Sequence, residues 1–294
     1  MYDVCVVGHV TRDRVQIPGR PDHEMPGGTA YYVARAWASL GLSVCVVTRV
    51  ASADAPSLLA DLRARGVHIR NLGSRRTTVF ENRYDGPALE NRSQRVLAVA
   101  DTIGPADLEG LSARAVHVGP LTRGEVHLDV FQYLPGLAPY VALDGQGLLR
   151  EVVDEQVRLR SFSRIGEVLP NLHLLKVDDT EAQVMVGMGP PKQAATRLAE
   201  AGVQEVLMTF ADRGSAVLSK GTYQPVAVCP PAETVDATGC GDTYVAAYIY
   251  ARLQHQQPAE AAFFASSAAS LKIAGYGPFV GNEADVRAHM QQVG

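Results

Sequence analysis

The segment from Asp236 to Asp242 has residue types and a spacing that suit phosphoryl-group chemistry. It reads Asp-Ala-Thr-Gly-Cys-Gly-Asp and precedes a run of small and apolar residues. We expect a helix to begin near residue 240, so that its unpaired N–H groups and positive dipole end point into the glycine turn. Such a turn binds phosphate, or the charge that develops on a phosphoryl group during transfer. Asp242 would accept the proton of an attacking hydroxyl.

A purely structural interpretation of this segment is that Asp242 caps a helix and the glycines only shape a turn. Three further features suit the same chemistry, and each also has a structural interpretation, as a solvated loop acid, a buried hydrogen-bonding group or an ordinary turn. Asp13 follows the first predicted strand, and a carboxylate can accept two hydrogen bonds from a vicinal diol. Asp144 also follows a strand, at the end where open α/β sheets bind ligands. Gly27 and Gly28 precede a helix and let the backbone approach a sugar-like molecule closely.

The 236–242 string resembles the C-terminal signature of the ribokinase-like (PfkB-type) carbohydrate kinases, which is commonly written D-T-x-G-A-G-D. Ala237 and Cys240 depart from that pattern, while both glycines and both aspartates are in place. The resemblance implies that Asp242 is the catalytic base. It also implies that the backbone amides of Gly239, Cys240 and Gly241 form an anion hole for the γ-phosphate of ATP.

The substrate side resembles the same family. Gly27-Gly28, followed by Leu40-Gly41, is similar to the first family signature, G-G-x-x-x-N-x-A and then L-G, although Tyr32 stands near the usual Asn. The resemblance assigns acceptor binding to the following residues: Asp13, Gly27, Gly28, Tyr31 and Asp144. The aromatic Tyr31-Tyr32 pair at this wall argues against a plain ribose or fructose specificity.

The donor side shows weaker similarities. Residues 176–181 resemble the N-x-x-E motif, in which Glu181 would orient Mg²⁺-bound water, with Asp178 in place of the usual Asn. Residues 209–214 resemble the T-x-G-x-x-G nucleotide turn, in which Ala211 replaces the first glycine. The resemblance therefore predicts ATP and Mg²⁺ as cofactors. The implied donor contacts are Asp178, Thr209, Gly214 and Ser266, the last lying where the family contacts adenine.

The resemblance also implies a loop that binds a monovalent cation such as K⁺. Its residues would be Asp236, Thr238, Lys272 and Gly277. The ligands would be mainly backbone carbonyls, together with the carboxylate of Asp236.

Short apolar runs alternate with helix-like segments along the chain. The runs are residues 4–8, 44–47, 115–118, 140–143, 172–176 and 206–210. The predicted helices are residues 30–40, 57–65, 148–158, 180–186, 191–201, 244–253 and 259–273. Continuously apolar strands alternating with helices predict an α/β fold in which helices flank a central, mainly parallel sheet.

Residues 10–25 and 75–100 break this rhythm with alternating polar and apolar positions, which predict strands with one wet face. We expect them to form a small β-sheet lid on a single ribokinase-like domain of residues 1–294. The lid would exclude water, a competing phosphate acceptor. Its exposed edge strands would favour a homodimer.

Composition excludes several classes of function. The chain has 294 residues, a net charge of −4 and no block of like charges, so neither a nucleic-acid footprint nor a membrane patch is expected. The four cysteines lie far apart, which disfavours zinc and disulfides. No long apolar stretch or signal-peptide pattern is present. We expect a cytoplasmic enzyme acting on a small molecule.

Three functions remain open from the sequence. The leading hypothesis is transfer of the ATP γ-phosphate to a hydroxyl of a sugar, polyol or inositol-like cyclitol. The cyclitol preference rests on the Asp-Gly-Gln-Gly segment at 144–147 and on residues of the predicted lid, which resemble inositol-kinase-like branches of the family. A nucleoside kinase is the first alternative, in which Tyr31, Tyr32 and Phe80 would stack a base. A non-catalytic ligand-binding protein is the second, supported by the departures at Asp178 and Ala211.

Overall fold

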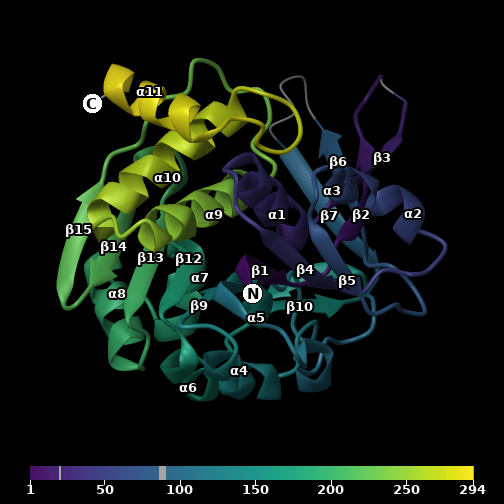
Figure 1. Ribbon diagram of the computed structural model, residues 1–294, viewed down its shortest axis with the longest axis horizontal. Helices are drawn as coiled ribbons and strands as arrows, with labels where there is room; N and C mark the ends of the chain where they lie inside the picture. The colour runs from purple at the N-terminus through teal and green to yellow at the C-terminus, as the bar shows by residue number, and fades with distance from the viewer. Residues whose placement is uncertain (20, 86–90, 294) are drawn as a thin grey trace.

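The larger of two sheets in the computed structural model has nine strands, in the order β15-β14-β13-β12-β9-β8-β1-β4-β5 (Figure 1). The structure describes residues 1–19, 21–85 and 91–293. The strands of this sheet are β1 (Tyr2–Val7), β4 (Val44–Thr48), β5 (His68–Asn71), β8 (Ala113–Val118), β9 (Tyr140–Asp144), β12 (Leu174–Asp178), β13 (Glu205–Thr209), β14 (Ser215–Ser219) and β15 (Thr222–Val226). All pairs are parallel except β13–β14 and β14–β15. The mainly parallel sheet predicted from the apolar runs is confirmed.

Helices cover both faces of this sheet because its strands are apolar on both faces. In β1, Val4 and Val6 pack in one core with α1, α9 and α10, while Cys5 and Val7 pack in a second core with α4 and α8. Burying each such side chain contributes about 1.5–3 kcal/mol. The helices are α1 (Thr29–Ser39), α2 (Ala55–Leu58), α3 (Ala60–Ala64), α4 (Asp129–Tyr133), α5 (Gln146–Leu149), α6 (Ile165–Val168), α7 (Asp179–Val186), α8 (Pro191–Glu200), α9 (Cys240–Leu253), α10 (Pro258–Ile273) and α11 (Glu283–Val293).

The second sheet has six strands in the order β10-β11-β7-β6-β2-β3. They are β2 (Thr11–Gln16), β3 (His23–Gly27), β6 (Val79–Asp85), β7 (Asn91–Ala98), β10 (Arg150–Val153) and β11 (Gln156–Leu159). Both polar segments predicted to form a small sheet contribute strands to it, so that sheet is confirmed. Residue 20 and residues 86–90 of those segments lie outside the described residues.

The helix predicted over residues 148–158 is wrong beyond its first two residues. Only α5 is helical there, and the chain then forms the antiparallel hairpin β10–β11. Val152 and Val157 are cross-strand partners that pack on the small core of the second sheet. Asp154 and Glu155 form the turn with φ of 51° and 61°. Val153 and Val157 are four residues apart, as on one helix face, but packing of Val152 and Val157 on the second sheet favours the strand.

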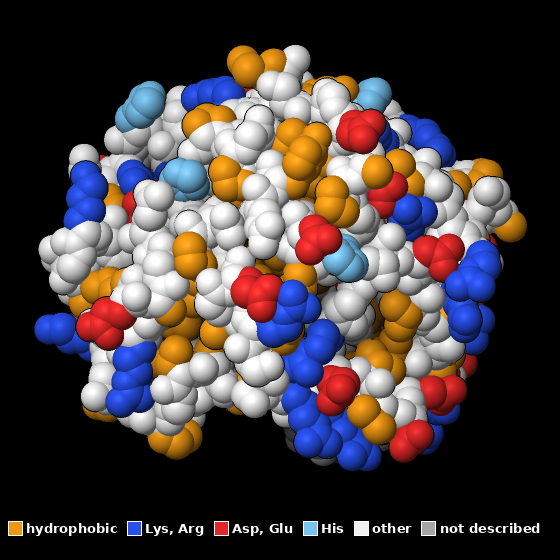
Figure 2. All heavy atoms as spheres, turned by 90° about the horizontal axis from the view of Figure 1, so that it is seen from below, with side chains coloured by type: hydrophobic (Ala, Val, Ile, Leu, Met, Phe, Trp, Pro, Cys, Tyr) orange, Lys and Arg blue, Asp and Glu red, His pale blue; other side chains and the backbone are white. Residues whose placement is uncertain are grey.

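The surface carries charges of both signs. Figure 2 shows basic and acidic side chains close to one another over the face seen from below the view of Figure 1. Exposed pairs such as Arg164–Glu167 and Arg95–Glu155 contribute to this mixture. Within the described residues, no helix has the length and apolar character that crossing a membrane requires.

Candidate active site

A cavity of about 230 Å³ lies where the second sheet meets the carboxyl ends of β9 and β12 and the first turn of α9. The residues predicted from the sequence that line it are Asp13, Gly28, Tyr32, Phe80, Asp144, Gln146, Thr238, Gly239, Gly241 and Asp242. The other lining residues are Thr11, Thr29, Gln94, Leu121, Arg150, Lys176 and Ala237. The cavity therefore unites residues that are more than 200 positions apart in the chain.

Asp242 lies in the first turn of α9, directly after the glycine turn. The helix begins at Cys240, and its N-cap is Gly239 in the left-handed region with φ of 77°. A Cβ at residue 239 would lie 2.4 Å from the ring of Tyr32. Only glycine meets both requirements, because it adopts positive φ without strain and leaves room for the ring. The Tyr32 ring therefore packs directly against the turn. Tyr32 stands near the position at which the family signature has Asn.

The surroundings of Asp242 raise the pKa of its carboxyl group toward neutral pH. Burial and the nearby charge of Asp144 raise the pKa of Asp242 to about 6, against the opposing effects of Lys176 and a hydrogen bond with Thr29. The carboxyl group is therefore mostly ionised at pH 7 and can accept a proton. A base with a pKa close to the working pH is well suited to proton transfer.

Lys176 is one of the cavity residues that sequence reasoning missed. It lies on β12 directly opposite Asp144 on β9, and its Nζ is 3.1 Å from Asp144 Oδ2. A Cβ on Gly241 would lie 3.6 Å from the same Nζ, so the ammonium faces the glycine turn. Burial would lower the pKa of Lys176, but Asp144, Glu181 and Asp242 outweigh it and raise that pKa. The signal was present in the sequence as a lysine inside an apolar strand.

Asp178 and Glu181 form a reciprocal capping box at the start of α7. Glu181 N donates to Asp178 Oδ1 at 2.7 Å, and Asp178 N donates to Glu181 Oε2 at 2.9 Å. Burial raises the pKa of Glu181 to about 7, against the opposing charge of Lys176. The described residues contain no cluster of three side chains that could hold a metal. Mg²⁺ would therefore fit here only with donor phosphates and water as its main ligands, and Glu181 would hold it through water.

Asp13 lies on the opposite wall, in β2. Its side chain is only 9% exposed, and Thr11 donates a hydrogen bond of 2.7 Å to its Oδ1. A Cβ on Gly27 would lie 2.5 Å from the Asp13 carboxylate, so the glycine in β3 leaves the space that this group occupies. Gly27 itself does not line the cavity, in contrast to Gly28.

The adjacent residues Tyr31 and Tyr32 have different surroundings. Tyr31 lies outside the cavity, which corrects the expectation that it contacts the substrate. The Tyr31 hydroxyl donates to Asp61 Oδ2 at 3.0 Å, and Tyr31 does not line the cavity. Tyr32 lines it together with Phe80 from the second sheet. Adjacent helical residues point about 100° apart, so α1 can present only one of the pair to the cavity.

A series of hydrogen bonds connects the site with the second sheet. Gln146 donates to Thr29 at 3.1 Å, and Arg150 donates to Gln146 and to Gln94, each at 3.2 Å. Gln94 in turn donates to Asn82 at 2.8 Å. These groups extend from the Asp242 side of the cavity to β6 and β7. The predicted Asp-Gly-Gln segment thus acts as a junction between the two sheets.

The sequence-predicted donor residues lie away from this cavity. Thr209 ends β13, and Gly214 follows a short turn in which Ala211 adopts φ of 53°. In that turn the Arg213 guanidinium lies 5.6 Å from the Phe210 ring centre and also pairs with Asp179 at 2.7 Å. None of these residues lines the cavity of Asp242.

Ser266 is engaged within the protein. Cys229 N donates to its hydroxyl at 2.9 Å, and that hydroxyl lies 3.4 Å from the carbonyl of Ala227, to which it donates. The side chain is 7% exposed. The backbone after β15 therefore lies against the residue that sequence similarity assigned to adenine.

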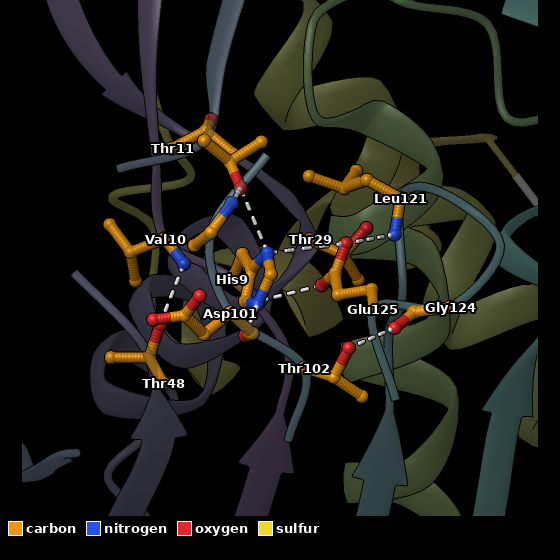
Figure 3. A network of polar contacts seen from close by, with 12 residues as sticks. His9, Val10, Thr11, Thr29, Thr48, Asp101, Thr102, Leu121, Gly124 and Glu125 are labelled. Carbon is orange, nitrogen blue, oxygen red and sulfur yellow. Dashed lines mark hydrogen bonds and ion pairs between the residues drawn. The ribbon is translucent and has the colours of Figure 1, made fainter. Parts of the chain in front are cut away.

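Three of the connections between the two sheets, which carry His9, Thr78 and Asp101, contact one another beside Glu125 (Figure 3). Glu125 Oε1 accepts from His9 N at 2.6 Å, and its Oε2 accepts from Leu121 N at 2.9 Å. The His9 ring contacts Thr78 at 2.8 Å and the carbonyl of Asp101 at 3.1 Å. Both carboxylate oxygens of a fully buried acid are thereby paired, which fixes where the second sheet joins the first.

Asp236 and its neighbours stand behind the glycine turn. Thr238 N donates to Asp236 Oδ1 at 2.9 Å, and Gly277 N donates to Asp236 Oδ2 at 3.2 Å. Lys272 Nζ donates to the Asp236 carbonyl at 2.6 Å. The four residues predicted to form a cation loop are thus together, but an ammonium group lies among them.

Comparison with known proteins identifies the class that this fold and site define. The sequence profile of the pfkB family carbohydrate kinases matches residues 151–284. This match, together with the ribokinase-family fold, supports a ribokinase-like carbohydrate kinase.

Three similar proteins refine that assignment. The cytidine kinase of Thermococcus kodakarensis is 27% identical over 85% of this chain and 88% of its own length. The inositol 3-kinase of Arabidopsis thaliana is 26% identical over 84% of this chain and 67% of its own length. A solved pyrophosphate-dependent kinase of the ribokinase family, in complex with a pyrophosphate analogue and myo-inositol, superposes with a TM-score of 0.86 at 27% identity, covering 97% of this chain and 99% of the other.

Proposed function

We propose that this kinase transfers a phosphoryl group to a hydroxyl of a cyclitol or sugar, with Asp242 as the general base. The observation that carries the proposal is the position of Asp242. It stands in the first turn of α9, beside the glycine turn and within the cavity that Asp13 and Asp144 also line. A hydroxyl bound there would lose its proton to Asp242 as its oxygen attacks phosphorus.

The amides of Gly239, Cys240 and Gly241 would stabilise the negative charge on the transferring group. They stand at the N-terminus of a 14-residue helix, where the helix dipole favours negative charge, and Cys240 N also donates to the Ala237 carbonyl at 3.2 Å. The Lys176 ammonium, which faces Gly241, would add a full positive charge on the adjacent side. Mg²⁺ bound to the donor would neutralise further phosphate charge when present.

The acceptor would bind between Asp13 and the relay of Gln146, Arg150 and Gln94. Asp13 would accept hydrogen bonds from two neighbouring hydroxyls, and the relay would present amide and guanidinium groups to others. A polar wall of this kind suits a ring with many hydroxyls. The second sheet, which supplies Asp13 and Gln94, would act as the lid that excludes water.

A nucleoside is the competing acceptor, because the chain is similar to a cytidine kinase. Tyr32 and Phe80 are the aromatic residues at the cavity, whereas Tyr31 faces Asp61. The Tyr32 ring already packs against Gly239. That contact leaves less aromatic surface for stacking a base and favours the cyclitol or sugar.

ATP is the donor that family membership supports first, with Thr209, Gly214 and Ser266 on the adenosine side. Pyrophosphate is a second candidate, favoured by a specific observation. The Ser266 hydroxyl already binds the backbone at residues 227 and 229, and Arg213 closes the 209–214 turn by stacking on Phe210. A donor without adenosine would need neither group to move. The pyrophosphate-dependent relative at a TM-score of 0.86 supports the same choice.

The test is a screen of two donors against several acceptors. ATP and pyrophosphate are each combined with myo-inositol, ribose, fructose and cytidine, and phosphorylated product is detected by mass spectrometry. We expect product with myo-inositol or a sugar and at least one of the donors. Cytidine as the sole accepted substrate would replace the proposed acceptor, and no product with any pair would refute the proposal.

Replacing the base separates chemistry from binding. Asp242→Asn keeps the shape of the side chain and removes its ability to take a proton, so kcat should fall by about 10²–10⁴-fold. Donor and acceptor affinities, measured by calorimetry, should change little. A variant with near-normal kcat would eliminate Asp242 as the base.

Pairing of two chains through the exposed edges of the second sheet remains a proposal. The outermost strands of that sheet are β3 and β10. An unpaired edge presents N–H and C=O groups to a second copy. Sedimentation of the full chain tests this proposal. A dimer is the expected result, and a monomer would show that those edges stay unpaired.

A further inference from the structure

The Lys272 ammonium occupies the position that family resemblance gives to a monovalent cation. Its Nζ donates to the Asp236 carbonyl at 2.6 Å and lies 3.3 Å from Asp236 Oδ2. The Lys272 side chain has no exposed surface. A carboxylate oxygen and a backbone carbonyl are the ligand types that replace the hydration shell of K⁺. Here a covalently attached cation already binds both, so K⁺ does not fit beside Asp236.

The contacts around Asp236 connect Lys272 with the catalytic turn. Thr238 N and Gly277 N donate to the two carboxylate oxygens of Asp236. The backbone N–H groups of Val235 and Asp236 both donate to the carbonyl of Ile273, at 2.9 and 3.1 Å. The Lys272 ammonium and these backbone hydrogen bonds together tie the end of α10 to the segment that leads into Gly239.

The charge of Asp236 makes this attachment strong. Burial would raise the pKa of Asp236, but the hydrogen bonds of Thr238 and Gly277 and the charge of Lys272 outweigh burial and lower it. Asp236 therefore stays ionised at neutral pH. The ionised carboxylate pairs with the buried ammonium at 3.3 Å, and the hydrogen bond that this ammonium donates to the Asp236 carbonyl is charge-assisted and therefore stronger than a neutral one.

We propose that Lys272 is a positioning residue that acts as a built-in monovalent cation and fixes the 236–241 turn, so that this kinase requires no added K⁺. The proposal goes beyond the proposed function and depends on it only for the activity readout. Lys272 does not line the cavity of Asp242, so its effect reaches the reaction through the conformation of the turn.

The first test uses the unmodified protein. Phosphoryl transfer is measured in KCl, NaCl and choline chloride at equal ionic strength, with substrates supplied as sodium salts. We expect rates that agree within about twofold, because no free site remains for the cation to bind and stabilise. A wild-type rate that rises tenfold or more with K⁺ would overturn the proposal.

The second test creates the missing site. Lys272→Ala removes the charge and leaves space beside Asp236, so kcat in choline chloride should fall by about 10- to 100-fold because the anion turn is misplaced. K⁺ or NH₄⁺ should restore most of that loss. Lys272→Met removes the charge but fills the space, so neither ion should restore it. Lys192→Ala, at an exposed lysine of α8, is the matched control and should behave as wild type.

The third readout is independent of catalysis. In thermal unfolding, KCl should raise the Tm of Lys272→Ala by on the order of 3 °C over choline chloride, because an ion that binds only the folded state stabilises it. Wild type and Lys272→Met should show no such difference. An Ala variant with wild-type activity and Tm in choline chloride would overturn the proposal. If the Ala variant does not fold, the wild-type salt comparison decides alone.

These readouts also separate the two proposals. A wild type that phosphorylates no acceptor, while KCl still raises the Tm of Lys272→Ala, refutes the proposed function and supports the role of Lys272. A wild type that transfers phosphate only in KCl supports the proposed function and refutes the role of Lys272.

Discussion

Two buried lysines stand on opposite sides of the glycine turn, and they differ in what they face. Lys176 faces the cavity, pairs with Asp144 and lies near the carboxylates of Glu181 and Asp242. Lys272 stands behind the turn, pairs with Asp236 and does not line the cavity. Both ammonium groups are buried and paired with an aspartate, so neither burial nor pairing distinguishes them.

The difference teaches how location assigns a role to the same chemical group. An ammonium that faces the transferring phosphoryl group would stabilise charge that develops during the reaction. An ammonium behind the turn would only fix the backbone that presents the amides. The first should affect kcat and the titration of the base, and the second should affect kcat alone.

Of the two lysines, Lys176 should show the larger effect when it is replaced by methionine. Removing a charge aimed at the transferring group should lower kcat by about 10²–10³-fold, as loss of one oxyanion-hole donor does. Steady-state kinetics with Lys192→Met as the control would measure it. A kcat within a few-fold of wild type would place Lys176 outside the chemistry and remove the contrast with Lys272.

A smaller effect is expected from Lys272→Met. Because the residue acts through the turn, kcat should fall by about tenfold while KM for the acceptor stays unchanged. The acid limb of the pH profile should also remain where it is in the wild type, since the charges that set the pKa of Asp242 are those of Asp144, Lys176 and Arg150. A shifted acid limb would show that Lys272 acts on the base directly.

The smallest effects are shifts of the acid limb itself. Because the base must be ionised, wild-type activity should rise with pH through about 6, the pKa to which burial raises Asp242. The Asp144 charge raises that pKa, so Asp144→Asn should move the limb to lower pH. The Lys176 charge lowers it, so the residual activity of Lys176→Met should rise at higher pH. Profiles of kcat/KM would measure both, and shifts of the same sign would contradict this electrostatic account.

Local sequence determined the elements and the chemical character of the turn. Three features act over only a few residues each. They are the period of the apolar residues, the glycines at 239 and 241, and the capping pair of Asp178 and Glu181. Each therefore leaves a pattern that can be read without the fold. The mainly parallel sheet, α9 and the position of Asp242 in its first turn followed from such patterns.

Tertiary structure decided which of these residues meet. Lys176 reaches Asp144 only because β9 and β12 are neighbours in one register. Residues 150–159 form a hairpin because Val152 and Val157 pack on the apolar core of the second sheet.

Packing also set the role of individual side chains. Tyr32 rather than Tyr31 faces the cavity because of how α1 is rotated against the turn. Lys272 reaches Asp236 across 36 residues and takes the place predicted for a free cation. Contacts between distant segments depend on register, rotation and packing, which local patterns do not encode.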